Sequence, residues 1–163
     1  MKKNFVIIFC LISFTSNAQT EPPKLYNPDA NAKKDIRAAV KKARAENKYV
    51  LIQGGGNWCT WCIEFARLCK ADPTIDSVMN ASFVWVHLNT SKENKNEKIF
   101  AKYGYPQRFG FPVFIILNKK GKRIHTQSSE YFEDGKKSYD HKKVQTFLEM
   151  WSPRALDPKM YTE

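Results

Sequence analysis

The chain has 163 residues, of which 42% are hydrophobic and 26% are charged, and its formal net charge is +11. This length fits a single domain, and the composition excludes a disordered tract, a collagen-like chain and a coiled coil. The basic residues are dispersed over several segments among acidic ones, which favours a solvated basic surface over a nucleic-acid site. We therefore expect no nucleic-acid partner, while attraction to acidic proteins or lipid headgroups stays open.

The N-terminus has the pattern of a secretory signal peptide. Two lysines precede a ten-residue apolar run, residues 5–14, and small residues follow it. The run is too short to span a bilayer, so we expect residues 1–18 to be removed, with no stable membrane insertion afterwards. Cys10 lies inside the run and directly after a phenylalanine, which disfavours a lipid anchor. The mature protein is therefore predicted to begin at Gln19 in an oxidising compartment, the periplasm if the source is a Gram-negative bacterium.

Residues 19–30 contain three prolines and few apolar side chains, which predicts a linker before the domain. Helical spacing of apolar residues, and short runs rich in β-branched or aromatic residues, predict the elements that follow. The expected helices cover residues 31–46, 59–70, 74–80, 99–103 and 140–151, and the expected strands cover residues 49–52, 83–88, 113–117 and 123–126. Gly54–Gly56 end the first strand, and residues 128–138 form a long polar loop. This order predicts an α/β domain over residues 31–151, a mixed central sheet flanked by helices on both faces, with a tail over residues 152–163.

The run Trp58-Cys59-Thr60-Trp61-Cys62 follows a predicted buried strand and opens a predicted helix. Residues three apart on a helix lie on one face about 5 to 6 Å apart, within reach of a disulfide. Cys59 falls at the helix start, where free backbone N–H groups and the helix dipole stabilise a thiolate, so we expect Cys59 to be the nucleophile. Cys62, one turn deeper, is expected to be the buried resolving thiol.

Two other interpretations of this pair are weaker. A structural zinc site needs four ligands, but the chain has one such cysteine pair and three isolated histidines, His87, His125 and His141. A purely structural disulfide across so short a loop would restrain little chain entropy and so stabilise little. Cys69 lies about 10 Å further along the helix, too far for a bridge to Cys62, and is expected to be a buried, unpaired hydrophobe.

With these residues the chain resembles the thioredoxin superfamily over about residues 31–151. Besides the cysteine pair and the strand before it, the matching parts are residues 100–104, the run Gly110-Phe111-Pro112-Val113 and the hairpin turn at residues 118–122. Ala71-Asp72-Pro73 is similar to the exported branch that includes the C-terminal domain of the bacterial transmembrane thiol-disulfide interchange reductase. The resemblance implies a thioredoxin-like fold, a redox-active pair, and a cis Phe111–Pro112 peptide beside it. It also implies that the backbone of Phe111 pairs with an extended substrate.

The chain departs from the thioredoxin pattern at several points. Gln53 stands where thioredoxins have a buried acid, so proton transfer from the resolving thiol needs water or another group such as Glu64. Thr60 and Trp61 stand between the cysteines in place of glycine and proline, and Gly54–Gly56 replace bulkier residues beside the site. These departures bear on the substrate and the redox potential more than on the fold.

Trp58 and Trp61 flank the pair, and two interpretations of them stay open. They are half-buried packing residues, or they form with Phe111 and Pro112 a surface that docks a flexible cysteine-bearing segment. We expect an exported thiol-disulfide oxidoreductase that acts on cysteine-containing protein substrates as a monomer, without metal or organic cofactor, and with another redox protein as electron donor or acceptor. The lack of a positive charge between the cysteines favours the reducing or isomerising direction. The alternative is a thioredoxin-fold binding or chaperone module with little redox turnover.

Overall fold

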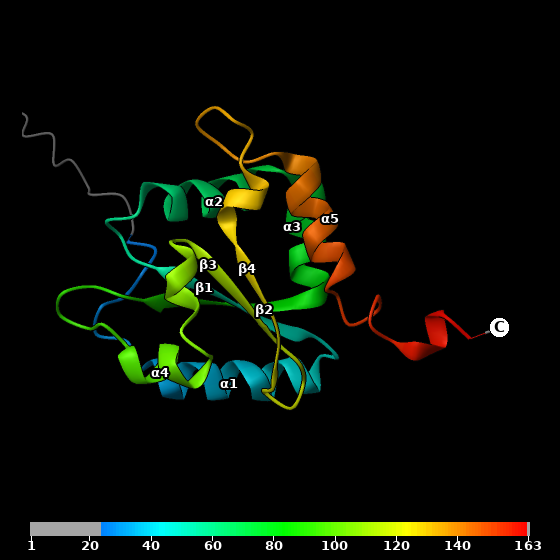
Figure 1. Ribbon diagram of the computed structural model, residues 1–163. Coiled ribbons are helices and arrows are strands. Elements are labelled where there is room, and N and C mark those ends of the chain that lie inside the picture. The colour runs from blue at the N-terminus through cyan, green and yellow to red at the C-terminus, as the bar shows by residue number, and fades with distance from the viewer. Residues whose placement is uncertain (1–23, 163) are drawn as a thin grey trace, which may run out of the picture.

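A four-stranded mixed sheet forms the centre of the computed structural model, which describes residues 24–162 (Figure 1). The strands lie in the order β2-β1-β3-β4. β1 (Tyr49–Gly55) pairs in parallel with β2 (Phe83–Asn89) and antiparallel with β3 (Val113–Leu117), and β3 pairs antiparallel with β4 (Arg123–Ser128). β1 and β3 are buried along almost their whole length, as expected of apolar runs in the middle of a sheet that is covered on both faces.

Helices cover both faces of the sheet (Figure 1). α1 (Ala32–Ala45) and α4 (Glu97–Lys102) lie on one face, and α2 (Thr60–Ala71), α3 (Pro73–Ser82) and α5 (His141–Met150) lie on the other. Within residues 24–162, no helix has the length and apolar character needed to cross a membrane. The arrangement confirms the predicted fold class, a mixed sheet between two layers of helices.

Each layer of helices packs against alternate residues of the central strands. On the α1 face, Ile36 packs in one cluster with Val50 and Ile52 of β1. On the opposite face, Leu51 packs in a second cluster with Phe65 of α2. Because successive side chains of a strand point to opposite faces, the single apolar run of β1 supplies both cores.

α2 and α3 are separate helices because of Asp72 and Pro73. The Asp72 Oδ1 accepts hydrogen bonds from the backbone N–H groups of Thr74 (2.9 Å) and Ile75 (3.1 Å), which caps α3. Pro73 occupies the first turn, where its missing N–H would have no partner in the helix. The Asp72 carboxylate also contacts His141 at the start of α5 (2.6 Å). Pro73 therefore begins α3, one residue before the predicted start of that helix at residue 74.

Two segments differ from their predicted structure. β1 does not end before the glycines but continues through Gly54 and Gly55, because both pair with the last residues of β2. The loop over residues 128–138 contains a 3-10 turn that buries Phe132, whose ring joins the core beside α2. The glycines thus belong to the rigid sheet, and part of the loop is anchored to the core.

Candidate functional site

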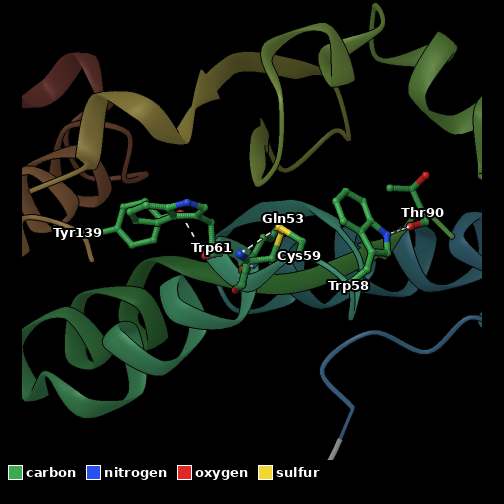
Figure 2. The surroundings of a disulfide bond; sticks show 7 residues. Gln53, Trp58, Cys59, Trp61, Thr90 and Tyr139 are labelled. Carbon is green, nitrogen blue, oxygen red and sulfur yellow. Dashed lines mark hydrogen bonds between the residues drawn. A yellow bond between two sulfur atoms is a disulfide. The ribbon is translucent and has the colours of Figure 1, made fainter. Parts of the chain in front are cut away.

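The two cysteines of the motif stand at the start of α2 and are joined by a disulfide, with their Cα atoms 5.2 Å apart (Figure 2). Cys59 is the N-cap residue of the helix, and its Sγ accepts a hydrogen bond from the backbone N–H of Cys62 (3.1 Å). This amide and the positive end of the helix dipole favour a negative charge on the Cys59 sulfur. Cys59 is 5% exposed and Cys62 is fully buried. The geometry suits an attacking first cysteine and a resolving second one.

Glycines at the end of β1 make room for the side chains of the site. A Cβ on Gly55 would lie 2.4 Å from the Sγ of Cys62 and 2.8 Å from the hydroxyl oxygen of Tyr26, far inside normal contact distance. A Cβ on Gly56 would lie 2.4 Å from the Nε1 of Trp58. The glycines therefore let both the disulfide and this indole approach the end of the strand closely.

The two tryptophans flank the disulfide and have different surroundings (Figure 2). Trp58 is 60% exposed, its Nε1 donates to the carbonyl oxygen of Thr90 (2.7 Å), and its ring meets that of Phe111 edge-on. Trp61 is half-buried and packs edge-on against Tyr139, whose hydroxyl donates to the Trp61 carbonyl oxygen (3.1 Å). Of the two interpretations, an exposed surface fits Trp58 and packing fits Trp61.

A groove of about 510 Å³ opens beside Trp58. The aromatic rings of Trp58, Phe100 and Phe111 line it, together with the side chains of Lys92 and Lys95. The groove is therefore apolar over part of its wall and carries basic groups over another part.

The loop before β3 comes back to the cysteine pair. The Phe111–Pro112 peptide bond is cis, and Pro112 is buried. Phe111 packs, partly buried, against the cluster that Cys59 and Cys62 form with Tyr26. The fold thus brings Phe111 against the cysteine pair, and the cis bond that the resemblance implies follows it directly in the chain.

Gln53 is fully buried on β1, and its Nε2 donates a hydrogen bond to the carbonyl oxygen of Cys62 (2.9 Å; Figure 2). This bond ties the first turn of α2 to the sheet. A carboxamide neither gains nor loses a proton in the ordinary pH range, so Gln53 holds the helix without serving as an acid or a base. Its Oε1 has no hydrogen-bond partner among the described residues.

Tyr26 is a site residue that its sequence context hardly reveals. It lies in the stretch predicted to be a linker, yet its side chain is fully buried against Cys59 and Cys62. Its backbone N–H donates to the Oδ1 of Asn57 (3.0 Å), and the Nδ2 of Asn57 donates back to its carbonyl oxygen (2.7 Å). Burial raises the pKa of the Tyr26 phenol far above its ordinary value. The one signal in the sequence is the apolar pair Leu25-Tyr26 in an otherwise polar, proline-rich stretch.

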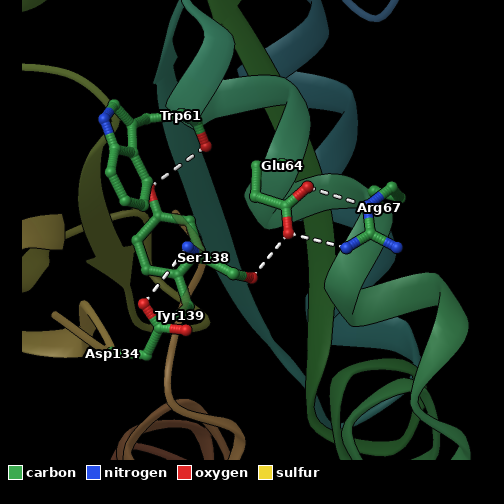
Figure 3. Close-up of polar contacts among 6 residues, drawn as sticks. All are labelled: Trp61, Glu64, Arg67, Asp134, Ser138 and Tyr139. Carbon is green, nitrogen blue, oxygen red and sulfur yellow. Dashed lines mark hydrogen bonds and ion pairs between the residues drawn. The ribbon is translucent and has the colours of Figure 1, made fainter. Parts of the chain in front are cut away.

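Glu64, the acid considered for proton transfer, is engaged elsewhere (Figure 3). Its carboxylate accepts two hydrogen bonds from Arg67, both of 2.7 Å, and one from the Oγ of Ser138 (2.5 Å). The hydrogen bonds from Arg67, more than that from Ser138, hold the pKa of Glu64 below its ordinary value. The expectation that Glu64 relays a proton is therefore wrong. Its carboxylate oxygens instead bond Ser138, in the loop after β4, and so hold that loop against α2.

Among residues 24–162, the third cysteine and two of the histidines lie in elements away from the start of α2. Cys69 is buried and unpaired within residues 24–162, which confirms its expected state, and burial raises the pKa of its thiol. A thiol of raised pKa is a poor nucleophile. His125 stacks on Trp151 with 3.8 Å between ring centroids, and His141 contacts Asp72. These histidines therefore have structural partners that the sequence did not reveal.

A family model described as thioredoxin-like matches residues 31–119. Among solved structures, a disulphide isomerase from Xylella fastidiosa Temecula1 is similar, with a TM-score of 0.68 and 21% identity over 77% of this chain and 94% of that chain. The C-terminal domain of DsbD from Neisseria meningitidis, in its oxidised form, gives a TM-score of 0.49 and 18% identity over 72% of this chain and 94% of that chain. No curated protein matches the chain. At these identities the likeness to the isomerase establishes the fold.

Proposed function

This chain belongs to the thioredoxin-like family, and we propose that it is an exported thiol-disulfide oxidoreductase that exchanges disulfides with protein substrates through Cys59 and Cys62. The observation that carries the proposal is the disulfide between these cysteines at the start of α2, with Cys62 buried behind Cys59. A bond across so short a loop contributes little to stability. The helix start, in contrast, makes the first sulfur a good nucleophile and leaving group.

In the reducing direction the reaction consists of two exchanges. The Cys59 thiolate attacks one sulfur of a substrate disulfide, which forms a mixed disulfide and releases one substrate thiolate to take up a proton. Cys62 then loses its proton to solvent and attacks the Sγ of Cys59, which breaks the mixed disulfide and releases the second substrate thiolate, again to be protonated. The protein dithiol is oxidised to a disulfide and the substrate disulfide is reduced to two thiols. Neither step requires a metal or an organic cofactor.

We assign the substrate side of the site to Trp58, Phe111 and Pro112. The exposed ring of Trp58 and the groove beside it support the docking of a flexible, cysteine-bearing segment next to Cys59. Trp61 contributes less to this surface, because its ring packs against the core.

The surroundings of the pair favour the reducing or isomerising direction. An oxidant needs its reduced form stabilised, which a strongly acidic first thiol achieves. Thr60 and Trp61 carry no positive charge and Gln53 is neutral, so the helix start is the main stabiliser of the Cys59 thiolate. Equilibration with glutathione buffers tests the direction. A potential near the roughly −270 mV of thioredoxin supports it, and one near the roughly −120 mV of a strong oxidant contradicts it.

Export rests on the N-terminal pattern alone, because residues 1–18 and the expected first residue, Gln19, lie outside the described residues. In a Gram-negative source this pattern places the protein in the periplasm. Another redox protein then has to return electrons to the Cys59–Cys62 disulfide after each turnover. Mass measurement of the secreted protein tests the cleavage site.

Insulin reduction by the purified protein and its cysteine variants tests the activity. We expect Cys59→Ser to abolish turnover and Cys62→Ser to trap a mixed disulfide between Cys59 and the substrate, which a small-molecule thiol releases. Cys69→Ser is the matched control, because this thiol is buried away from the site, and it is expected to keep activity. Full activity in Cys59→Ser would overturn the assignment. Suppression of insulin aggregation without any reduction would favour a binding or chaperone module instead.

A further inference from the structure

A buried polar corner surrounds the sulfur of Cys62 on the side that faces β1. The Cys62 Sγ and the Tyr26 hydroxyl oxygen both lie next to one point, the position of the Cβ that Gly55 lacks, at 2.4 Å and 2.8 Å from it. Tyr26 packs in one buried cluster with Cys59 and Cys62. A polar group from the segment before α1 therefore sits beside the resolving cysteine.

Three buried polar atoms around this corner have no hydrogen bond of ordinary geometry in the part of the chain that the structure describes: the Tyr26 hydroxyl, the Gln53 Oε1 and the His87 Nε2. Tyr26 and Gln53 are 0% exposed. A hydrogen-bonding contact with the Gln53 side chain lowers the pKa of the phenol less than burial raises it, while the Gln53 Nε2 donates to the Cys62 carbonyl oxygen (2.9 Å). A buried hydroxyl without a well-formed hydrogen bond is costly, so this one points to a stronger partner in another state of the protein. The neighbouring atom that changes state during the reaction is the Cys62 sulfur.

We propose that the Tyr26 hydroxyl forms a hydrogen bond with the Cys62 sulfur in the reduced protein and assists the step in which Cys62 resolves the mixed disulfide. The inference rests on the oxidoreductase function proposed above. A thiolate accepts a much stronger hydrogen bond than a neutral thiol or a disulfide sulfur. The contact therefore strengthens when Cys62 loses its proton. Tyr26 thereby supplies a hydrogen-bond donor to the Cys62 sulfur. The Gln53 carboxamide does not, because its Nε2 donates to the Cys62 carbonyl oxygen.

The hydroxyl acts without giving up its proton. When Cys62 releases its own proton to solvent, the buried thiolate requires a donor, because an unpaired buried charge is strongly unfavourable. Tyr26 stays protonated, since burial keeps its pKa far above the ordinary value, and it donates to the thiolate. The thiolate attacks the Cys59 Sγ, the bond from Cys59 to the substrate sulfur breaks, and the substrate thiolate takes up a proton from solvent. The overall exchange is unchanged.

Among the titratable groups around the pair, Tyr26 is the one whose polar atom lies beside the Cys62 sulfur. His87, opposite Gln53 in the β1–β2 register, meets the Tyr26 ring edge-on with 5.5 Å between ring centroids. Burial, with a smaller contribution from Lys70, lowers the pKa of His87 to about 4, so its imidazole stays neutral over the pH range in which a thiol titrates and does not produce the pH dependence of the resolving step. Cys59 belongs to the pair, and Glu64, Arg67 and Tyr139 have hydrogen-bond partners of their own. Cys69 and Lys70 lie at the far end of α2, two turns or more beyond the pair.

The test is the pH dependence of the resolving step in the wild-type protein and in the variants Tyr26→Phe and Tyr139→Phe. Reduced protein is mixed with dithiobis(nitrobenzoate). Cys59 releases the first equivalent of coloured thiolate and Cys62 releases the second, so the second phase reports the resolving step. Tyr26→Phe removes the hydroxyl and keeps the ring. Tyr139→Phe is the matched control, because its buried hydroxyl bonds to the backbone of Trp61 in α2 and not to the sulfur.

In Tyr26→Phe the pH midpoint of the second phase is expected to rise by about one unit, with release about tenfold slower at neutral pH, as the loss of one hydrogen bond to a charged group requires. Tyr139→Phe is expected to keep the wild-type profile. An unchanged profile in Tyr26→Phe, or equal shifts in both variants, overturns the role of Tyr26. A wild-type protein that releases no second equivalent overturns the proposed function and this inference with it. Thermal unfolding of each oxidised variant checks that it is folded.

Discussion

Replacing Gly55 with alanine is expected to destabilise the oxidised protein more than replacing Gly54, the other glycine of β1. The new Cβ would lie 2.4 Å from the Cys62 Sγ and 2.8 Å from the Tyr26 hydroxyl oxygen, whereas ordinary contacts are about 3.5 to 4.0 Å. The strand cannot yield easily, because the N–H of Thr90 donates to the Gly55 carbonyl oxygen (2.6 Å) and the strand pairs with β2. The sulfur is held by the disulfide, so the Tyr26 segment is the part that moves.

Overpacking of this kind costs about 1 to 3 kcal/mol, and the displacement of a buried tyrosine places Gly55→Ala near 3 kcal/mol, at the top of that range. Urea unfolding of the oxidised protein measures the loss. The matched control is Gly54→Ala, whose Cβ would meet the side chains of Val113 and Phe100 at 3.1 and 3.2 Å. There we expect about 1 kcal/mol or less, because these side chains adjust and alanine restrains the unfolded chain. Equal losses in the two variants would refute the reasoning.

Two further predictions concern buried groups near the site. The pKa of His87 is lowered from 6.5 to about 4, chiefly by burial. Between these two pH values the His87 side chain is protonated in the unfolded chain and neutral in the folded protein. Stability should therefore fall by about 2 kcal/mol between about pH 7 and about pH 5, and His87→Phe should remove that part of the pH dependence in urea unfolding curves. A variant with the wild-type slope would contradict this. Cys69→Ala leaves a small cavity in the core beside α2 and should cost about 1 kcal/mol with insulin reduction intact, and loss of activity in a folded variant would count against a purely structural Cys69.

Much of the site follows from local sequence, because its chemistry acts over a few residues. A cysteine that begins a helix and a second one three positions later lie together in any helix of normal geometry. The placement of Cys59 at the cap and of Cys62 one turn deeper therefore needs no tertiary information. The same holds for the apolar run at the centre of β1, because its successive side chains point to opposite faces of the sheet and pack into both cores.

Contacts between distant segments could not be predicted in this way. Glu64 looks like an available acid in the sequence, but the folded chain brings Ser138 to it and Arg67 completes its partners. The two tryptophans are equivalent in the motif, and only the positions of Thr90 and Tyr139 decide that Trp58 is exposed and that Trp61 is packed. The spacing of apolar residues and their helix or strand propensities do not indicate which loop packs over which face of the sheet.

The sequence by itself therefore determined the class of fold, the order of the elements and the reactive pair, because burial patterns and helix-end electrostatics are encoded within a turn or a strand. Tertiary structure alone decided what surrounds Cys62. Tyr26 reaches the sulfur from a proline-rich stretch because Asn57 clamps its backbone and Gly55 leaves space for its hydroxyl. Such a fit depends on the shapes of three packed segments at once, which no local pattern contains.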